Sequence, residues 1–214
     1  MKQIAPSILS ADFANLGRDI EMINRSDADI FHIDVMDGTF VPNISFGFPV
    51  MVPLKQLAKK PLDVHLMIVH PEKYVERFCD AGAWSVGFHL EAVDDPMPIL
   101  QLIRNKGVRT CLTINPDIDV KRLDPYLGEV DMVLIMSVFA GFGGQKFIPE
   151  AMDKIRHVRE EIDRRGLKTL VEVDGGVTID NAADIFAAGA DILVAGSAVF
   201  NAPDPIEAIR QMKR

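Results

Sequence analysis

A regular alternation of short apolar runs and helical patterns along the whole chain constrains its fold most. The strand-like runs are QIAPSILS, DIFHIDV, LDVHLMI, WSVGFHL, VRTCLTI, DMVLIMSV, TLVEVD and DILVAG. Between and after them, helical patterns cover residues 13–24, 49–59, 72–81, 96–106, 119–126, 149–165, 179–188 and 204–213. Eight strand–helix units in 214 residues predict an α/β fold of the closed parallel (β/α)8, or TIM barrel, type.

The ends of several predicted helices carry punctuating residues. Ser10 or Asp12 precedes the first helix and Pro149 opens the sixth. Glycines placed as C-terminal caps follow four of the predicted helices: Gly82, Gly107, Gly166 and Gly189. A doubly wound open sheet is the alternative architecture, but SADFANL after the first strand lacks the Gly-rich fingerprint typical of it. No low-complexity linker divides the chain, so we expect one catalytic domain over residues 1–214.

Composition excludes several classes of partner. The formal net charge of -8 and a pI of about 5.1 disfavour binding to a nucleic-acid backbone. No apolar run approaches the roughly 18 residues of a membrane span, and MKQIAPSILSADF does not resemble an export signal. Cys79 and Cys111 have neither metal-motif spacing nor the density of a disulfide framework. We therefore expect a cytoplasmic protein with two reduced, buried thiols.

Polar residues gather at the ends of predicted strands, where barrels of this kind carry their active sites. In FHIDVMDG, His32 and Asp34 share one face of the strand, because alternate residues point the same way. His65 near the end of the third strand and Asp174 at the end of the seventh complete the group. Any one of them alone is explained as a hydrogen-bonded core residue. Together, two imidazoles and two carboxylates suit one divalent ion, with Zn, Mn, Fe and Co as candidates and positions left for substrate.

Glycine-rich loops follow the last three strands. AGFGGQ, DGG and AGS come after strands six, seven and eight. A single such glycine indicates only a turn, but three consecutive loops predict a cradle whose backbone N–H groups hold a phosphate. No lysine lies in these motifs. The candidate contacts are Gly141, Gly143, Gly144, Gly175, Gly176, Gly196 and Ser197.

Further side chains point inward at the same ends of the strands. Met36, Met67 and Met136 have this parity, and they either fill the core or form an apolar lid over a reactive intermediate. Ser7 either binds substrate or bonds only to its neighbours. His89 and Glu91, at the end of the fourth strand, are candidates for hydrogen bonding to the metal ligands.

Six motifs, in order and spanning essentially the whole chain, resemble the ribulose-phosphate 3-epimerase family. They are SILSADFANL, FHIDVMDGTFVPNISFG, DVHLMI, GFGGQKFI, EVDGGV and AGSAVF. The resemblance implies an isomerase that interconverts D-ribulose 5-phosphate and D-xylulose 5-phosphate in the pentose phosphate pathway. It also implies a homo-oligomer, because the family includes dimers and larger rings.

The resemblance further implies roles for individual residues. A divalent metal, often zinc, would lie on His32, Asp34, His65 and Asp174, and the two aspartates would be the acid–base pair. The methionines would cap the intermediate, while Ser7, His65, Asp174 and the glycine loops with Ser197 would bind the sugar phosphate.

One stretch departs from the family pattern. After strand six the family has Asn-Pro-Gly-Phe-Gly-Gly-Gln, whereas this chain has Phe139 and Ala140 at the first two positions. The change frees a torsion that proline fixes and adds bulk near the site. It keeps open a hexulose phosphate such as D-allulose 6-phosphate as the substrate. More distant alternatives are a non-catalytic sugar-phosphate sensor and a metal-free decarboxylase or synthase subunit, which typically needs a lysine at a strand end; none ends a strand here.

Overall fold

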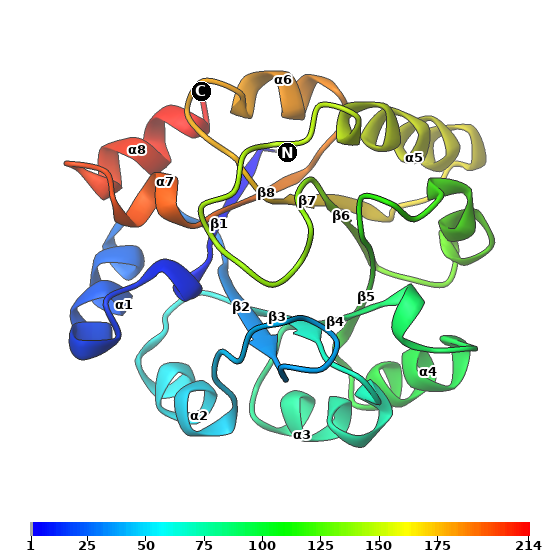
Figure 1. Cartoon of the computed structure of the whole chain (residues 1–214), viewed down its shortest axis with the longest axis horizontal. Coiled ribbons are helices and arrows are strands. Elements are labelled where there is room, and N and C mark those ends of the chain that lie inside the picture. Colours follow the sequence, from blue (N-terminus) through cyan, green and yellow to red (C-terminus); the bar gives the residue numbers. More distant parts are fainter. Residues whose placement is uncertain (1) are drawn as a thin grey trace.

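Eight parallel strands form a barrel surrounded by helices in the computed structural model, which describes residues 2–214 (Figure 1). The order in the sheet is β1-β8-β7-β6-β5-β4-β3-β2, and each pair of neighbours is parallel. This confirms the predicted TIM barrel. The strands are β1 (Gln3–Pro6), β2 (Phe31–Met36), β3 (Leu62–Met67), β4 (Ser85–His89), β5 (Arg109–Ile114), β6 (Met132–Met136), β7 (Leu170–Asp174) and β8 (Ile192–Ala195).

The barrel closes between β1 and β2 through few backbone contacts. An isolated parallel bridge joins Ser7 to His32. Near the other end of β1, the N–H of Asp29 donates to the carbonyl of Ile4 at 2.9 Å, and the Asp29 carboxylate accepts the N–H of Ile4 at 2.9 Å. The closing edge therefore lies beside the two polar residues of β2 that were singled out from the sequence.

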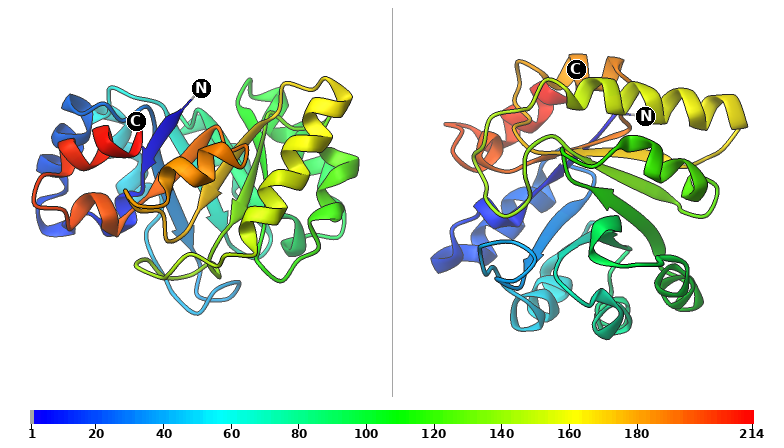
Figure 2. Two further views of the ribbon diagram at one scale, coloured as in Figure 1. Left: turned by 90° about the horizontal axis from the view of Figure 1, so that it is seen from above. Right: turned by 45° about the vertical axis from the view of Figure 1, so that its right-hand side comes forward.

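Helices surround the barrel, as Figures 1 and 2 show. The α-helices are α1 (Leu16–Arg25), α2 (Phe48–Leu57), α3 (Val75–Asp80), α4 (Met97–Asn105), α5 (Ala151–Arg165), α6 (Ala182–Ala187), α7 (Ser197–Phe200) and α8 (Pro205–Met212). The 3-10 helices are η1 (Ile8–Ser10), η2 (Phe13–Asn15), η3 (Pro71–Lys73), η4 (Leu90–Ala92) and η5 (Val120–Tyr126). No helix within residues 2–214 has both the length and the apolar character required to cross a membrane.

Some element boundaries differ from the prediction. The first strand ends at Pro6, because the Ser7 hydroxyl accepts the N–H of Leu9 at 3.3 Å and starts η1. Residues 120–126 form a 3-10 helix rather than an α-helix and include Pro125, which has no N–H to donate. The sixth helix begins two residues after Pro149, at Ala151. Gly166 ends this helix with φ 63°, as predicted for a C-terminal cap.

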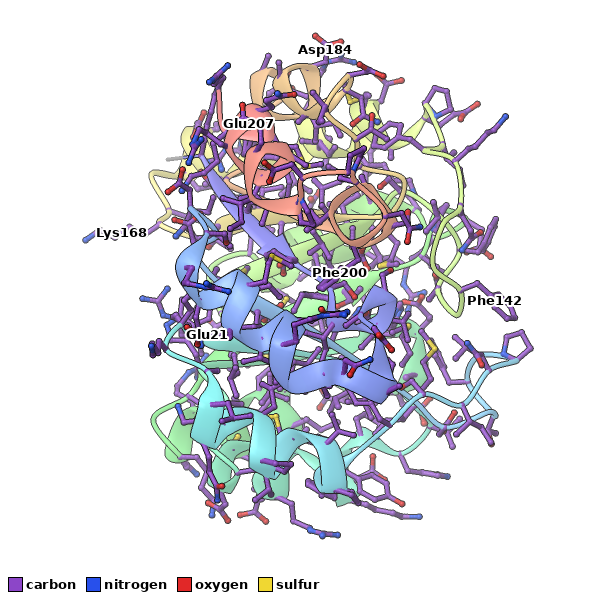
Figure 3. All side chains as sticks on the ribbon, turned by 90° about the vertical axis from the view of Figure 1, so that its left-hand side faces the viewer. Glu21, Phe142, Lys168, Asp184, Phe200 and Glu207 are labelled. Carbon is purple, nitrogen blue, oxygen red and sulfur yellow. The ribbon has the colours of Figure 1, made fainter. Side chains whose placement is uncertain are left out.

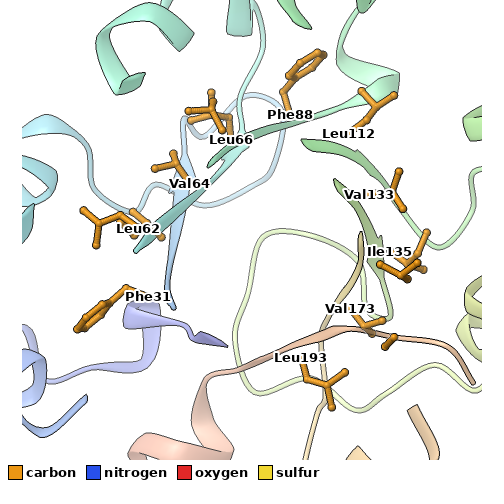
Figure 4. Packing of buried hydrophobic residues seen from close by; sticks show 14 of the residues in the cluster. Phe31, Leu62, Val64, Leu66, Phe88, Leu112, Val133, Ile135, Val173 and Leu193 are labelled. Carbon is orange, nitrogen blue, oxygen red and sulfur yellow. The ribbon is translucent and has the colours of Figure 1, made fainter. Parts of the chain in front are cut away.

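Apolar side chains pack in two places, between the strands and the helices and inside the barrel. Outward-facing strand residues such as Phe31, Val64 and Leu193 pack against the helices (Figure 4). Inside the barrel, a smaller cluster includes Met132 and Leu134 and also contains Cys111, a free, buried thiol as expected. Other interior positions carry fully or almost fully buried polar side chains: Ser7, His32, Asp34, Asp63, His65, Ser85, His89, Thr113 and Glu172. The alternation of β2 is thereby explained, because its apolar face meets the helices and its polar face meets the interior.

Candidate active site

The four predicted metal ligands converge at one end of the barrel. Asp34 Oδ1 lies 3.3 Å from His32 Nε2 and 3.2 Å from His65 Nδ1. Asp174 Oδ2 lies 4.0 Å from each of the same two nitrogens. One ligand atom from each residue lies within 4.8 Å of all the others, so the four could hold one metal ion. The strands β2, β3 and β7 bring them together.

The chemistry of these donors fits a divalent cation. Among residues 2–214, the buried Nε2 of His32 has no hydrogen-bond partner, although it points at the centre of the group. Such an atom is costly unless something satisfies it. Two imidazole nitrogens with two carboxylates are the donor set of borderline metals such as zinc and manganese. The residues present therefore fit the ion that the sequence predicts.

The two aspartates differ in acidity. Burial alone would raise the pKa of Asp34, but the adjacent His32 and His65 hold it well below its usual range. Burial, reinforced by the charge of Asp34, raises the pKa of Asp174 to about 7. One carboxylate is thus ionised, while the other takes up a proton near neutral pH.

The two histidines differ as well. Burial lowers the pKa of His65 to about 4, so this imidazole is neutral and can act as a ligand. Burial opposes protonation of His32, but the charge of Asp34 prevails and raises the pKa well above its ordinary value. Metal binding must therefore release a proton from His32.

A second group of polar side chains, which the sequence analysis missed, lies beneath the first. His32 Nδ1 lies 2.7 Å from Asp63 Oδ2, and the Ser85 hydroxyl donates to the other oxygen of Asp63. Glu172 Oε1 lies 3.6 Å from His32 Nδ1. Burial and the charge of Asp63 raise the pKa of Glu172 to about 8. Strand parity could have identified both carboxylates, because Asp63 lies two residues before His65 and Glu172 two residues before Asp174, and such residues share one face of a strand.

A pocket opens beside the four ligands and includes nearly every predicted substrate contact. Asp34 and Asp174 lie in its wall, whereas His65 does not. The predicted residues that line it are Ser7, Met36, Met67, Met136, Gly141, Gly143, Gly144, Gly175, Gly176, Gly196 and Ser197. Met36 and Met67 also pack with Val41 in a small apolar cluster of their own.

Two glycines at the end of β7 are required by close packing. Gly175 and Gly176 have φ of 120° and 64°, which side chains rarely permit. A Cβ on Gly176 would lie 2.2 Å from the backbone nitrogen of Phe147, and one on Gly175 would lie 2.4 Å from Val138 Cγ2. The backbone after β7 therefore lies directly against the segment that follows β6.

The loop between β6 and α5 runs across the barrel opening in Figure 1 and lies on the same side of the barrel as the β2–α2 loop in Figure 2. Asn43 Nδ2 donates to the carbonyl of Gly141 at 2.9 Å, joining the two loops. Gln145 Nε2 donates to the carbonyls of Phe139 and Phe142 at 2.7 and 2.9 Å. The Phe142 side chain projects away from the barrel (Figure 3). Nothing in the sequence singles out Asn43 or Gln145, because their partners are backbone carbonyls.

Solved structures confirm the architecture alone, because their sequence identity to this chain is low. The KGPDC structure from Streptococcus mutans superposes with a TM-score of 0.73 at 12% identity, covering 100% of this chain and 96% of that one. A mutant tryptophan synthase α-subunit from Pyrococcus furiosus gives a TM-score of 0.71 at 15% identity, covering 98% and 96%.

Sequence relatives are far more similar. Ribulose-phosphate 3-epimerase of Synechocystis is 50% identical over 208 residues, covering 96% of this chain and 90% of its own. The Escherichia coli and Bacillus subtilis enzymes of the same name are 46% and 44% identical, each covering 100% of this chain and 96% and 99% of their own. A sequence model of the ribulose-phosphate 3 epimerase family matches residues 3–200. The chain is therefore an isomerase that belongs to the ribulose-phosphate 3-epimerase family.

Proposed function

We propose that this enzyme interconverts D-ribulose 5-phosphate and D-xylulose 5-phosphate by a metal-dependent, two-aspartate mechanism, as a step of the pentose phosphate pathway. The observation that carries the mechanism is that Asp34 and Asp174 lie at one ion-sized centre, line one pocket and have pKa values shifted in opposite directions. Inverting a carbon centre needs one proton removed from one face and one supplied to the other, and two carboxylates in different protonation states meet that need.

A divalent ion, zinc first with Mn, Fe and Co as alternatives, would be held by His32, Asp34, His65 and Asp174. Its charge would polarise the C2 carbonyl of the ketose and stabilise the negative charge that develops there. The family membership and His32 Nε2, which makes no hydrogen bond within residues 2–214, support this assignment.

The aspartates would move the protons. The ionised carboxylate takes the C3 proton from one face and leaves a planar cis-enediolate. The protonated carboxyl donates its proton to the opposite face of C3, which inverts the configuration. In the reverse direction the two roles exchange. Ser7 would hold the base in place, because its hydroxyl donates to Asp34 Oδ2 at 2.5 Å.

The remaining pocket residues would hold the sugar phosphate. Met36, Met67 and Met136 would cover the enediolate with apolar atoms, which excludes water from a reactive species. The phosphate would lie among the glycine loops and Ser197, where the first turn of α7 leaves N–H groups without intrahelical acceptors. Backbone dipoles would hold it, since none of the described residues that line the pocket is a lysine.

A hexulose 6-phosphate such as D-allulose 6-phosphate is a second candidate substrate. Phe139 lines the pocket with half of its surface exposed, at a position where the family pattern has asparagine. Comparing kcat/KM on the pentulose and hexulose phosphates decides between the two.

We propose further that the enzyme works in the cytoplasm. We also propose that it is a homo-oligomer, and sedimentation at micromolar concentration tests its oligomeric state.

Epimerisation of D-ribulose 5-phosphate by the purified protein, before and after chelation and with metal analysis of the same sample, tests the main proposal. Activity that disappears on chelation and returns with Zn or Mn is the expected result. Bound metal without turnover of this sugar would move the proposal to the hexulose phosphate. Full activity in a metal-free sample would contradict the metal-dependent mechanism.

A further inference from the structure

A chain of hydrogen bonds leads away from the metal site through His89 and Glu91. His65 Nε2 lies 2.9 Å from His89 Nε2, with the ring centroids 5.0 Å apart and the ring planes 24° from parallel. The two imidazoles therefore meet edge to edge. His89 Nδ1 lies 3.0 Å from Glu91 Oε1. His89 is fully buried, so its nitrogens have no bulk water to turn to.

The metal site at one end of this series of hydrogen bonds determines where its protons lie. The Nδ1 of His65 faces Asp34 and the centre of the proposed metal site, so it must carry no proton when an ion is bound. The His65 proton then lies on Nε2 and is donated to His89 Nε2. His89 consequently carries its own proton on Nδ1 and donates it to the Glu91 carboxylate. The opposite arrangement would put a proton on the ligand atom and leave two lone pairs facing each other at Glu91.

Asn115, just after β5, holds Glu91 at the other end of this series of hydrogen bonds. Its backbone N–H and its Nδ2 donate to Glu91 Oε1 at 3.0 and 2.8 Å. Its Oδ1 accepts the N–H of Ala140 at 3.1 Å. Ala140 lines the pocket and packs against the cluster of Met36 and Met67. A proline at position 140 would have no N–H to give, so this link requires a residue other than proline there, in this protein Ala140.

We propose that His89, Glu91 and Asn115 are positioning residues that connect the metal site to the β6–α5 loop. Through His89, the Glu91 carboxylate keeps the proton of His65 on Nε2 and away from Nδ1. It thereby makes Nδ1 more basic and a stronger ligand for the metal. Through Asn115, the same carboxylate holds the backbone of the loop at Ala140. The inference rests on the proposed metal site, because it assigns His65 as a ligand through Nδ1.

Cobalt binding tests the first half of the inference without relying on turnover. Glu91→Gln and His89→Phe should each weaken Co²⁺ binding by about 10–100-fold, and they should change the visible absorption of the cobalt protein. The dissociation constant is measured by competition with a chromophoric chelator. Glu161→Gln is the matched control, since Glu161 is similarly accessible, with 19% of its side chain exposed against 16% for Glu91, but pairs with Arg164 and Arg165 on α5.

The outcomes separate the two proposals. A wild-type protein that binds no cobalt would contradict the metal site of the proposed function. Normal cobalt binding by the wild type together with unchanged affinity and absorption in a folded Glu91→Gln variant would overturn the positioning role alone. Glu91→Gln decides if His89→Phe does not fold, because Gln keeps the size of the side chain at a partly exposed position.

Asn115→Ala tests the link to the loop. The variant keeps the backbone N–H that bonds Glu91 but loses the side-chain bonds to Glu91 and Ala140, together with the 3.4 Å contact between Asn115 Nδ2 and His89 Nδ1. We expect KM for D-ribulose 5-phosphate to rise by about fivefold, corresponding to one lost hydrogen bond, while cobalt affinity falls less than in Glu91→Gln. A KM equal to that of the wild type would overturn the loop half of the proposal.

Discussion

At the scale of single residues, Asp34 and Asp174 have the same functional group but different surroundings. Asp34 lies almost fully buried between two imidazoles, while Asp174 keeps 18% of its side chain open to the pocket. The histidines stabilise the charge of Asp34, and that charge in turn disfavours ionisation of Asp174. The difference in acidity therefore comes from position rather than residue type.

Replacing either carboxylate should remove most of the activity. Asp34→Asn and Asp174→Asn should each lower kcat for D-ribulose 5-phosphate by at least about three orders of magnitude, because proton transfer and metal binding are both lost. Steady-state kinetics on the purified, metal-loaded variants checks this. Near-normal turnover in either variant would reject the two-base assignment.

Glu172 should make the stability of the metal-free protein depend on pH. Its pKa is about 8 in the folded state against 4.5 unfolded, so the folded state holds one more proton between these values. Stability should therefore fall as pH rises through this window, by on the order of 1 kcal/mol per pH unit. Urea unfolding at pH 6 and pH 8 with a chelator present measures the change.

Glu172→Gln is the comparison for this measurement. The variant should lose less stability than the wild type between the two pH values, because Gln cannot release a proton. The pKa of Asp174 is also raised, so this group contributes with the same sign in both proteins. Equal losses in the two proteins would show that Glu172 does not titrate in this range.

Much of the candidate site could be predicted from the sequence. His32, Asp34, His65 and Asp174 lie at strand ends, where position and parity together predict a shared centre, and the structure brings them together. Asp63 and Glu172 have the correct parity but lie deeper along their strands. Burying a carboxylate there is costly without hydrogen-bond or charge partners, so the sequence alone does not predict that these two side chains are buried. Those partners, Ser85 and His32, come from other strands, so only the folded barrel reveals them.

At the scale of elements, the close contact between the end of β7 and the β6–α5 loop should be sensitive to one methyl group. Gly176→Ala places a Cβ 2.2 Å from the nitrogen of Phe147 in a left-handed conformation, with φ 64°. Gly166→Ala is the matched control, since its φ is 63° and, apart from its two chain neighbours, no described residue has a heavy atom within 4 Å of the added Cβ.

The two variants separate conformational strain from steric overlap. Gly166→Ala should cost about 1 kcal/mol for the left-handed backbone alone. Gly176→Ala should cost at least a further ~2 kcal/mol for the overlap. Denaturant unfolding of both variants checks the difference, and equal losses would contradict the close approach.

The elements that could not be predicted are short and depend on local detail. α7 has four residues, too few for a helical period to show in the sequence. Residues 8–10 continue the apolar pattern of β1, yet the Ser7 side chain turns the backbone into η1. The longer strands and helices follow the predicted alternation, because each repeats its apolar period several times.

At the scale of the whole molecule, a metal ion would join strands that lie far apart in the sequence. Its ligands come from β2, β3 and β7, so binding requires the folded barrel. Adding Zn to the chelated protein at 100 times the dissociation constant should stabilise it by about 2.7 kcal/mol. Thermal unfolding with and without the metal measures this, and an unchanged Tm would argue against binding to the native state.

The pairing of β1 with β8 has a consequence for synthesis on the ribosome. Gln3 to Pro6 lie in register with Ile192 to Ala195, so the first strand cannot form this pairing until the last strand has been synthesised. Three of the candidate ligands have been made once residue 65 is added, and the fourth comes with residue 174. The pocket, however, needs both Ser7 and Ser197. A nascent chain released after residue 174 but before residue 192 would thus carry every candidate metal ligand and still lack part of its substrate pocket.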